Sequence, residues 1–87
     1  MLFLARVLHM PDGGQLRNRV VEVFDGVVND IYCFSGEVPS MTFLDDVFVA
    51  TISSLESVED INKASYPVED ERLYAYGLNG TGKLFLL

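Results

Sequence analysis

Residues 16–34, LRNRVVEVFDGVVNDIYCF, decide the fold of this chain, because two β-branched runs flank the pair Asp25-Gly26. Branched and aromatic side chains favour an extended backbone, on which they pack well against neighbouring strands. Asp-Gly suits a two-residue type I′ turn, in which both central residues need a positive φ that glycine adopts without steric cost. The stretch therefore predicts a β-hairpin.

The rest of the chain continues this β pattern. Residues 2–9 predict a strand with apolar groups on both faces, which is typical of a strand inside a sheet. Alternation places Phe3, Ala5, Val7 and His9 on one of these faces. A further extended run is predicted from Met41 to Ile52, interrupted by a turn or bulge at Asp45-Asp46 and followed there by a short strand at 47–52. The chain is predicted to end in a hairpin of 72–78 and 83–87 around a loop at 79–82.

One segment, near residues 54–64, has helical rather than β periodicity. Leu55, Val58 and Ile61 recur at three-residue spacing, and Ser53 with Glu56 fits a capping box. We therefore expect one mainly β domain spanning residues 1–87. Its fold is a small β-sandwich or partly open barrel of two hairpins plus one or two further strands, with one short helix near 54–64.

The charge and apolar content restrict the partners. The net charge is −7, which argues against nucleic acid and against anionic membranes. Hydrophobic residues make up 49% of a chain of only 87 residues, so either the core is generous or some apolar surface is buried against another chain. We expect the partner to be a second copy, in a homo-oligomer, or another protein chain. The apolar opening MLFLARVL is too short for a signal sequence or a membrane span. With a single cysteine, no internal disulfide is possible, and we expect a cytoplasmic protein.

Residues that could carry chemistry are few. Gly77 to Lys83 has the glycine and lysine spacing of a phosphate-binding loop, but Leu84 replaces the Ser or Thr that such a loop requires, so a hairpin loop is expected. His9 is the single histidine, and among its sequence neighbours only Asp12 could act as a partner, so a surface histidine at a strand end is expected. Cys33 lies in an apolar strand and is expected to be a buried, inert thiol.

Two larger groups of residues have similarly simple interpretations. The acidic residues are expected to form a solvated face: Asp45, Asp46, Glu56, Glu59, Asp60, Glu69, Asp70 and Glu71. The aromatic residues of the second half are expected in the core rather than in a recognition patch: Phe48, Tyr66, Tyr74, Tyr76 and Phe85. One histidine and one cysteine cannot complete a zinc or iron site, so we assign no catalytic, cofactor-binding or metal-binding residue and expect no cofactor.

Residues 3–50 resemble the N-terminal part of the small β-sandwich of the amidohydrolase, or metal-dependent hydrolase, superfamily. The resemblance is carried by Ala5-Arg6-Val7-Leu8, Asp12-Gly13-Gly14, Arg19-Val20-Val21-Glu22-Val23, Asp25-Gly26-Val27-Val28 and Ile31. In that family the segment leads into a strand whose histidines bind metal, whereas residues 47–52 here read VFVATI and contain no histidine. The resemblance therefore implies a detached accessory domain without the catalytic barrel. It also implies that the first and last strands lie side by side in one sheet.

Two functions follow from these observations. The leading hypothesis is a non-enzymatic structural or interaction module that pairs with itself or with another chain. The alternative is a small ligand-binding or enzymatic β-barrel, with a pocket that uses His9 together with tyrosine and aspartate side chains.

Overall fold

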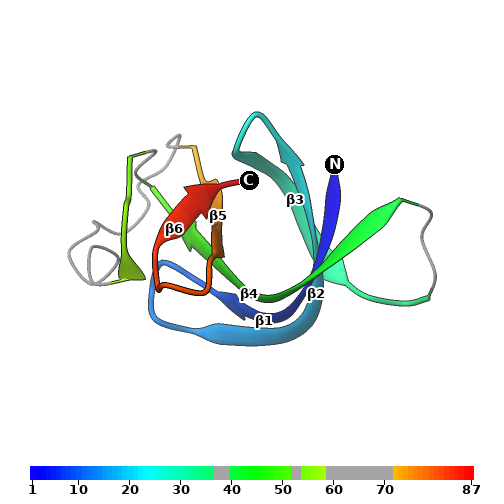
Figure 1. Ribbon diagram of the computed structural model, residues 1–87. Helices are drawn as coiled ribbons and strands as arrows, with labels where there is room; N and C mark the ends of the chain where they lie inside the picture. Colours follow the sequence, from blue (N-terminus) through cyan, green and yellow to red (C-terminus); the bar gives the residue numbers. More distant parts are fainter. Residues whose placement is uncertain (37–39, 52–53, 59–71) are drawn as a thin grey trace.

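The computed structural model describes residues 1–36, 40–51, 54–58 and 72–87, and its described part is mainly β. The six strands are β1 (Leu2–His9), β2 (Gln15–Phe24), β3 (Val27–Cys33), β4 (Met41–Ala50), β5 (Tyr74–Leu78) and β6 (Leu84–Leu86). They form one sheet of order β3-β2-β1-β4-β5-β6, in which only the β1–β4 pair is parallel. The sheet curls until β3 meets β5 (Figure 1), so the prediction of a partly open barrel is confirmed.

The hairpin at Asp25-Gly26 forms as predicted and also closes the ring. Asp25 has φ 51° and Gly26 φ 80°, which are the two positive values that a type I′ turn needs. The carbonyl oxygen of Gly26 accepts a hydrogen bond of 2.9 Å from the backbone N–H of Ala75. On the other side of the turn, the N–H of Val28 donates to the carbonyl oxygen of Leu73 at 2.8 Å. These two bonds attach the turn to the segment that contains β5.

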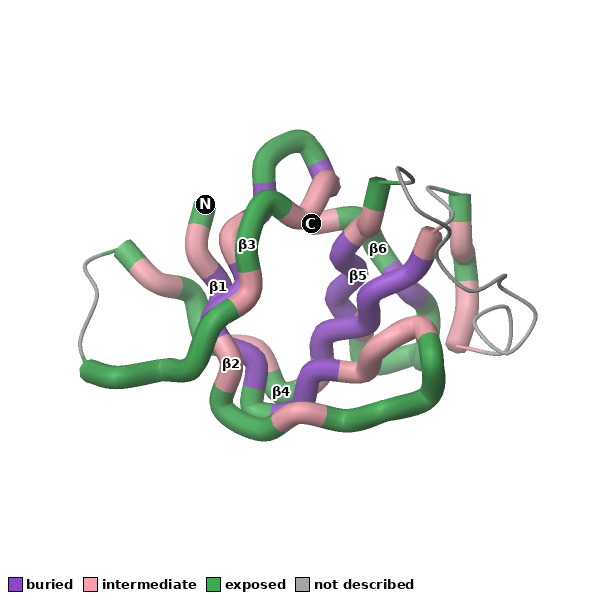
Figure 2. Tube along the Cα trace, turned by 180° about the vertical axis from the view of Figure 1, so that it is seen from behind, coloured by how far each residue is buried: buried purple, intermediate pink, exposed green. Residues whose placement is uncertain are grey.

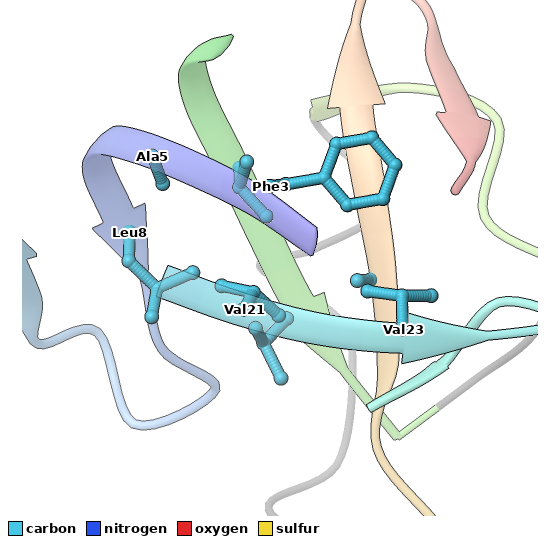
Figure 3. Close-up of a cluster of buried hydrophobic side chains, with 8 residues drawn as sticks. Phe3, Ala5, Leu8, Val21 and Val23 are labelled. Atoms are coloured by element: carbon cyan, nitrogen blue, oxygen red, sulfur yellow. The ribbon is translucent and has the colours of Figure 1, made fainter. Parts of the chain in front are cut away.

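The predicted strand at 2–9 is confirmed as β1, which lies between β2 and β4 at the centre of the sheet. Its core-facing side chains differ from the predicted face, because Leu8 rather than Val7 follows Phe3 and Ala5 into the main core cluster. Figure 3 shows Phe3, Ala5 and Leu8 gathered with Val21 and Val23 of β2. The face changes where the sheet bends: Asn18, which lies opposite Arg6, has φ 53°.

The predicted turn or bulge at Asp45-Asp46 is wrong, whereas the strand predicted at 47–52 is confirmed over residues 47–50, where it is the second half of β4. β4 runs from Met41 to Ala50 without interruption, and residue 52 lies outside the described residues. Its parallel pairing with β1 continues on both sides of Asp45, with Ala5 opposite Leu44 and Val7 opposite Asp46. Each of the two carboxylates contacts a side chain of β1: Asp45 lies beside Arg6, and Asp46 lies beside His9.

A second core cluster lies beside β5 and joins the C-terminal hairpin to the rest. It contains Phe48, Ala50, Tyr76 and Leu84. The prediction of a helix near 54–64 fails over residues 54–57, where Ser57 forms a β-bridge with Lys83 and the carbonyl of Glu56 accepts a hydrogen bond from Leu84 N. Residues 59–64 of that prediction lie outside the described residues.

The predicted C-terminal hairpin is confirmed as β5 and β6, and so is its loop. The side-chain oxygen of Asn79 accepts backbone hydrogen bonds from Thr81 at 2.9 Å and from Lys83 at 3.0 Å. This geometry is that of a tight polar turn, in which the asparagine stands in for a backbone acceptor. The phosphate-loop spacing at Gly77 to Lys83 therefore belongs to a hairpin loop.

The expectation that the two terminal strands lie side by side is wrong. β1 and β6 share the sheet, but β4 and β5 lie between them. The N-terminal amino group donates to the carbonyl of Val23 at 2.9 Å, and the N–H of Leu87 donates to the carbonyl of Ala75 at 2.9 Å. β1 already has β2 and β4 on its two sides, so no edge of β1 remains for β6. Figure 2 shows the buried segments along the middle of the curled sheet and the exposed ones at the hairpin tip and at the β3–β4 end.

Candidate interaction surface

A row of four apolar side chains crosses the outer face of the sheet. Phe43 of β4 is the partner of Leu4 in β1, Leu4 is the partner of Val20 in β2, and Val20 is the partner of Tyr32 in β3. Paired residues of neighbouring strands point to the same face, and the next residues, Phe3 and Val21, are in the core. The row therefore lies on the face turned away from the core.

This apolar row is buried in the middle and open at its ends. Val20 is fully buried, whereas Phe43 is 71% exposed and Tyr32 is 38% exposed. Phe34 follows β3, and its N–H donates to the carbonyl of Asn18 at 3.1 Å, which continues the β2–β3 pairing beyond Cys33. Phe34 is 39% exposed. We call Phe34, Phe43 and Tyr32, with Leu4 and Val20, the aromatic face.

A groove of about 310 Å³ lies at the end of the aromatic face that holds Phe43 and Leu4. Its lining is completed by Arg6, Asn18, Leu44 and Asp45. The Nε of Arg6 lies 3.2 Å from Oδ1 of Asp45, and both side chains are mostly exposed. An exposed ion pair of this kind adds little stability, but it places two charged groups of the groove lining beside the apolar side chains of Leu4 and Phe43. Asn18, which has a positive φ of 53°, is also part of the groove lining.

Two strand edges are free in the described part of the chain: one on β4 beside the groove, and one on β3 at the opposite end of the aromatic face. β5 pairs with β4 only over Val47–Ala50, so the segment from Met41 to Asp46 has β1 on one side and no described strand on the other. β3 meets β5 only at Val27, and from residue 29 onward its outer edge has no described strand partner. Free edges offer unpaired backbone donors and acceptors to an added strand.

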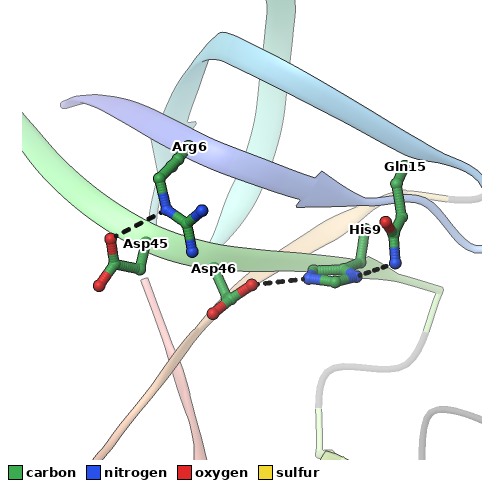
Figure 4. Close-up of polar contacts among 5 residues, drawn as sticks. All are labelled: Arg6, His9, Gln15, Asp45 and Asp46. Carbon is green, nitrogen blue, oxygen red and sulfur yellow. Dashed lines mark hydrogen bonds and ion pairs between the residues drawn. The ribbon is translucent and has the colours of Figure 1, made fainter.

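His9 lies in a separate polar cluster that joins three strands (Figure 4). Its Nε2 is 2.9 Å from Oδ1 of Asp46, and its Nδ1 is 3.5 Å from the side-chain nitrogen of Gln15. The ring also stacks on Phe48, with centroids 4.1 Å apart and planes 8° apart. With a proton on Nε2, the ring donates a hydrogen bond to Oδ1 of Asp46.

The partner of His9 was not found from the sequence. Asp12 was the expected neighbour, but its Oδ1 accepts the N–H of Gly14 at 2.8 Å, while Asp46 is 37 residues away along the chain. Only the parallel register of β1 and β4 brings His9 and Asp46 together, and no local sequence pattern reveals that register. Because both ring nitrogens have neighbours and Phe48 covers one ring face, the cluster is built to hold strands together.

Cys33 is exposed, so the prediction of a buried thiol is wrong. The apolar composition of its strand suggested burial, but β3 is the end strand of the sheet order, and most of its second half faces solvent. Cys33 pairs with Arg19 across the β2–β3 ladder, beyond the region where the core covers the strand.

The remaining candidate residues divide between core and surface. Phe48 and Tyr76 are buried as predicted, whereas Phe85 is 45% exposed. Burial raises the pKa of the Tyr76 hydroxyl above its ordinary value, although the N–H of Leu55 donates to it at 3.4 Å. Tyr74 is partly buried and packs on the second cluster, and residue 66 lies outside the described residues.

The predicted acidic face is only partly described. Asp45 and Asp46 contact cationic or imidazole groups on β1, and Glu56 is exposed, while residues 59, 60 and 69–71 lie outside the described residues. Among the residues that the structure describes, no three His, Cys, Asp or Glu side chains are grouped so that they could hold a metal ion. No helix within the described ranges is long and apolar enough to cross a membrane.

Comparison with known proteins identified no relative of this chain. No protein-family model, no curated protein and no solved structure matches this chain. The resemblance to the amidohydrolase sandwich therefore stays a prediction, and the chain is characterised here by its own fold and surface.

Proposed function

We propose that this protein is a non-enzymatic interaction module that binds a segment of another protein chain on its aromatic face. The observation that carries the proposal is Phe43, a large aromatic side chain that is 71% exposed on the wall of a groove beside a free strand edge. Exposed aromatic groups next to a concave surface are typical of recognition sites, since they bury much apolar area when a partner binds.

The size of the aromatic face favours a short segment over a second copy of this chain. Phe43, Tyr32 and Phe34 are 71%, 38% and 39% exposed. With about 200 Å² for a full aromatic side chain, these fractions correspond to roughly 300 Å² of accessible surface. A stable dimer buries about 800 Å² on each partner, so this face alone is too small for one. It matches an extended segment that adds to a strand edge and places one or two side chains in the groove.

The charge of the surface favours a basic segment. Glu22 and Asp30 are paired with each other across β2 and β3 on the same face as Leu2, and Asp45 borders the groove, whereas Arg6 is the basic residue of the groove wall. The whole chain carries a net charge of −7, which repels a second copy and attracts a cationic partner. We therefore propose an extended segment that alternates apolar residues with lysine or arginine.

One form of this proposal follows from the resemblance described above. The partner would then be an amidohydrolase-type enzyme, with this chain as its detached accessory domain; the motifs within residues 3–50 are its support. We propose a cytoplasmic location, supported by the single, unpaired cysteine of the chain.

The alternative of a catalytic or ligand-binding pocket built from His9 and tyrosines has less support. Both nitrogens of His9 already face Asp46 and Gln15, and Tyr76 is buried in the second core cluster. The contact of Nε2 with Asp46 joins β1 to β4, and Phe48 stacks on the ring, so the described contacts of His9 are structural ones.

The test uses isotope-labelled full-length protein and two ten-residue peptides, one alternating lysine with valine and one alternating glutamate with valine. We expect the basic peptide to shift the amide resonances of Leu4, Arg6 and Phe43, and the acidic peptide to shift none of them. Phe43→Ser should abolish the shifts. Phe24→Ser is the matched control, because Phe24 is 68% exposed but lies at the hairpin turn.

Two results would overturn the proposal. Equal effects of both peptides, or binding that survives Phe43→Ser, would remove the aromatic face as the site. Light scattering that finds a dimer abolished by Phe43→Ser would assign the face to a second copy instead.

A further inference from the structure

A cavity of about 410 Å³ lies at the end of the ring that holds the β1–β2 turn, away from the aromatic face. Its apolar lining comes from Met10, Pro11, Leu16 and Leu73, and its polar lining includes Asp12 and Gln15. Mouths of β-barrels are common places for small-molecule sites, which range from about 300 to 1,000 Å³. The cavity therefore has the size and position of a small-molecule site.

The walls of this cavity are held by the core and by the turn. Met10, Leu16 and Leu73 all pack against the main core cluster. The turn is closed by a hydrogen bond of 2.8 Å from Met10 N to the carbonyl of Gly14, and Oδ1 of Asp12 accepts the N–H of Gly14 at 2.8 Å. The carbonyl of Leu73 is fixed by the N–H of Val28 at 2.8 Å. A ligand would thus meet a surface that is already formed, which lowers the entropic cost of binding.

The chemistry of the lining defines the ligand. Asp12 is the charged residue of the cavity lining, while Met10, Pro11, Leu16 and Leu73 are apolar. Its Oδ1 is held by Gly14, but a carboxylate accepts several hydrogen bonds, so it retains acceptor positions for a further donor. Apolar walls beside one anchored carboxylate suit a molecule with an apolar tail and a cationic head.

We infer that this cavity binds a small aliphatic amine, with its tail against Leu16 and Leu73 and its ammonium group at Asp12. This inference goes beyond the proposed interaction function and uses none of the residues of the aromatic face. The attraction between ammonium and carboxylate is a charge-assisted hydrogen bond, which is stronger than a neutral one.

The experiment compares three probes with the same eight-carbon tail: octylamine, octanol and octanoate. They are titrated separately into isotope-labelled full-length protein. We expect octylamine to bind about tenfold more tightly than octanol, as one charge-assisted hydrogen bond implies, and octanoate to bind most weakly. The amide shifts should centre on residues 10–16 and Leu73.

Two variants separate the head from the tail. Asp12→Asn keeps the shape of the side chain and its acceptor for Gly14, and should bring the affinity for octylamine down to that for octanol. Leu16→Phe fills the cavity and should abolish binding of both probes; if its thermal melt shows an unfolded chain, Leu73→Phe is the second variant. Phe43→Ser should leave octylamine binding unchanged, so a failure of the interaction proposal is distinguishable from a failure of this one.

The inference is overturned if Asp12→Asn leaves the ratio of the octylamine and octanol affinities unchanged. It is also overturned if neither cavity-filling variant, once shown to be folded, weakens binding, or if the shifts lie away from the β1–β2 turn.

Discussion

Replacing Gly26 by alanine adds two separate strains to the hairpin turn. The backbone of Gly26 has φ 80°, a conformation that residues with a side chain rarely adopt. A Cβ added to Gly26 would also lie 2.5 Å from Cγ of Leu86, which is closer than real Cβ contacts come. The side chain of Leu86 in β6 therefore occupies the place where a side chain on Gly26 would begin.

The two costs are similar in size. A left-handed conformation costs a residue with a Cβ about 1–2 kcal/mol. Leu86 is 43% exposed, so it can move outward, but it then loses about half of the 1.5–3 kcal/mol that full burial of a leucine contributes. Gly26→Ala should therefore lower the free energy of unfolding by about 2–3 kcal/mol, out of the 5–15 kcal/mol typical of a small domain. Gly26→Val should cost more, because a β-branched residue is least tolerant of positive φ.

Two other glycines provide matched controls. Gly82 has φ 82° but nothing within 4 Å of an added Cβ, so Gly82→Ala should show the backbone cost alone, about 1–2 kcal/mol. Gly80 has neither a positive φ nor a close neighbour, and Gly80→Ala should be nearly neutral. In a Leu86→Ala background, Gly26→Ala should lower the free energy of unfolding by the backbone cost alone, because the contact with Leu86 is gone. A double-mutant cycle measures this difference directly.

Urea unfolding of these variants decides between the two causes. If Gly26→Ala and Gly82→Ala cost the same within about 0.5 kcal/mol, the contact with Leu86 contributes nothing. If Gly26→Ala is as mild as Gly80→Ala, the turn does not have a positive φ, and the description of the central hairpin is wrong.

Three further predictions concern the C-terminal half. Burial raises the pKa of the Tyr76 hydroxyl, so the unfolded chain loses this proton at a lower pH than the folded chain. The free energy of unfolding should therefore fall as the pH rises above about 10. Thermal melts at a series of pH values should show a weaker alkaline decline for Tyr76→Phe. A Cβ on Gly77 would overlap Cζ of Phe85, so Gly77→Ala should cost about 1–2 kcal/mol in urea unfolding. The control is the same substitution in a Phe85→Ala background, where no added cost is expected. Deleting residues 83–87 removes the buried Leu84 and uncovers the edge of β5. Hydrogen exchange should then show that the amides of β5 have lost their protection. Native protection of these amides in the truncated chain would refute the prediction.

Local sequence was sufficient where local chemistry decides the structure. The hairpin of β2 and β3 was predictable because Asp25-Gly26 itself supplies the positive φ values of its turn. The C-terminal hairpin loop was predictable for the same reason, since Asn79 bonds to residues two and four positions further on. The partly open barrel followed from the number of strands and from their apolar content.

Long-range pairing decided what the sequence did not reveal. Asp45 and Asp46 indicated a turn, yet they lie inside β4, because the parallel backbone pairing with β1 runs on past them. This pairing places them beside Arg6 and His9, which stand 39 and 37 residues earlier in the chain. Cys33 is exposed at the end of β3, the end strand of the sheet order, beyond the part that the core covers. The aromatic face exists because one register brings Phe43 to Leu4 and another brings Val20 to Tyr32. A strand's neighbours and register depend on contacts between distant segments, so the composition of a strand indicates that it forms but not which of its faces remains open to a partner.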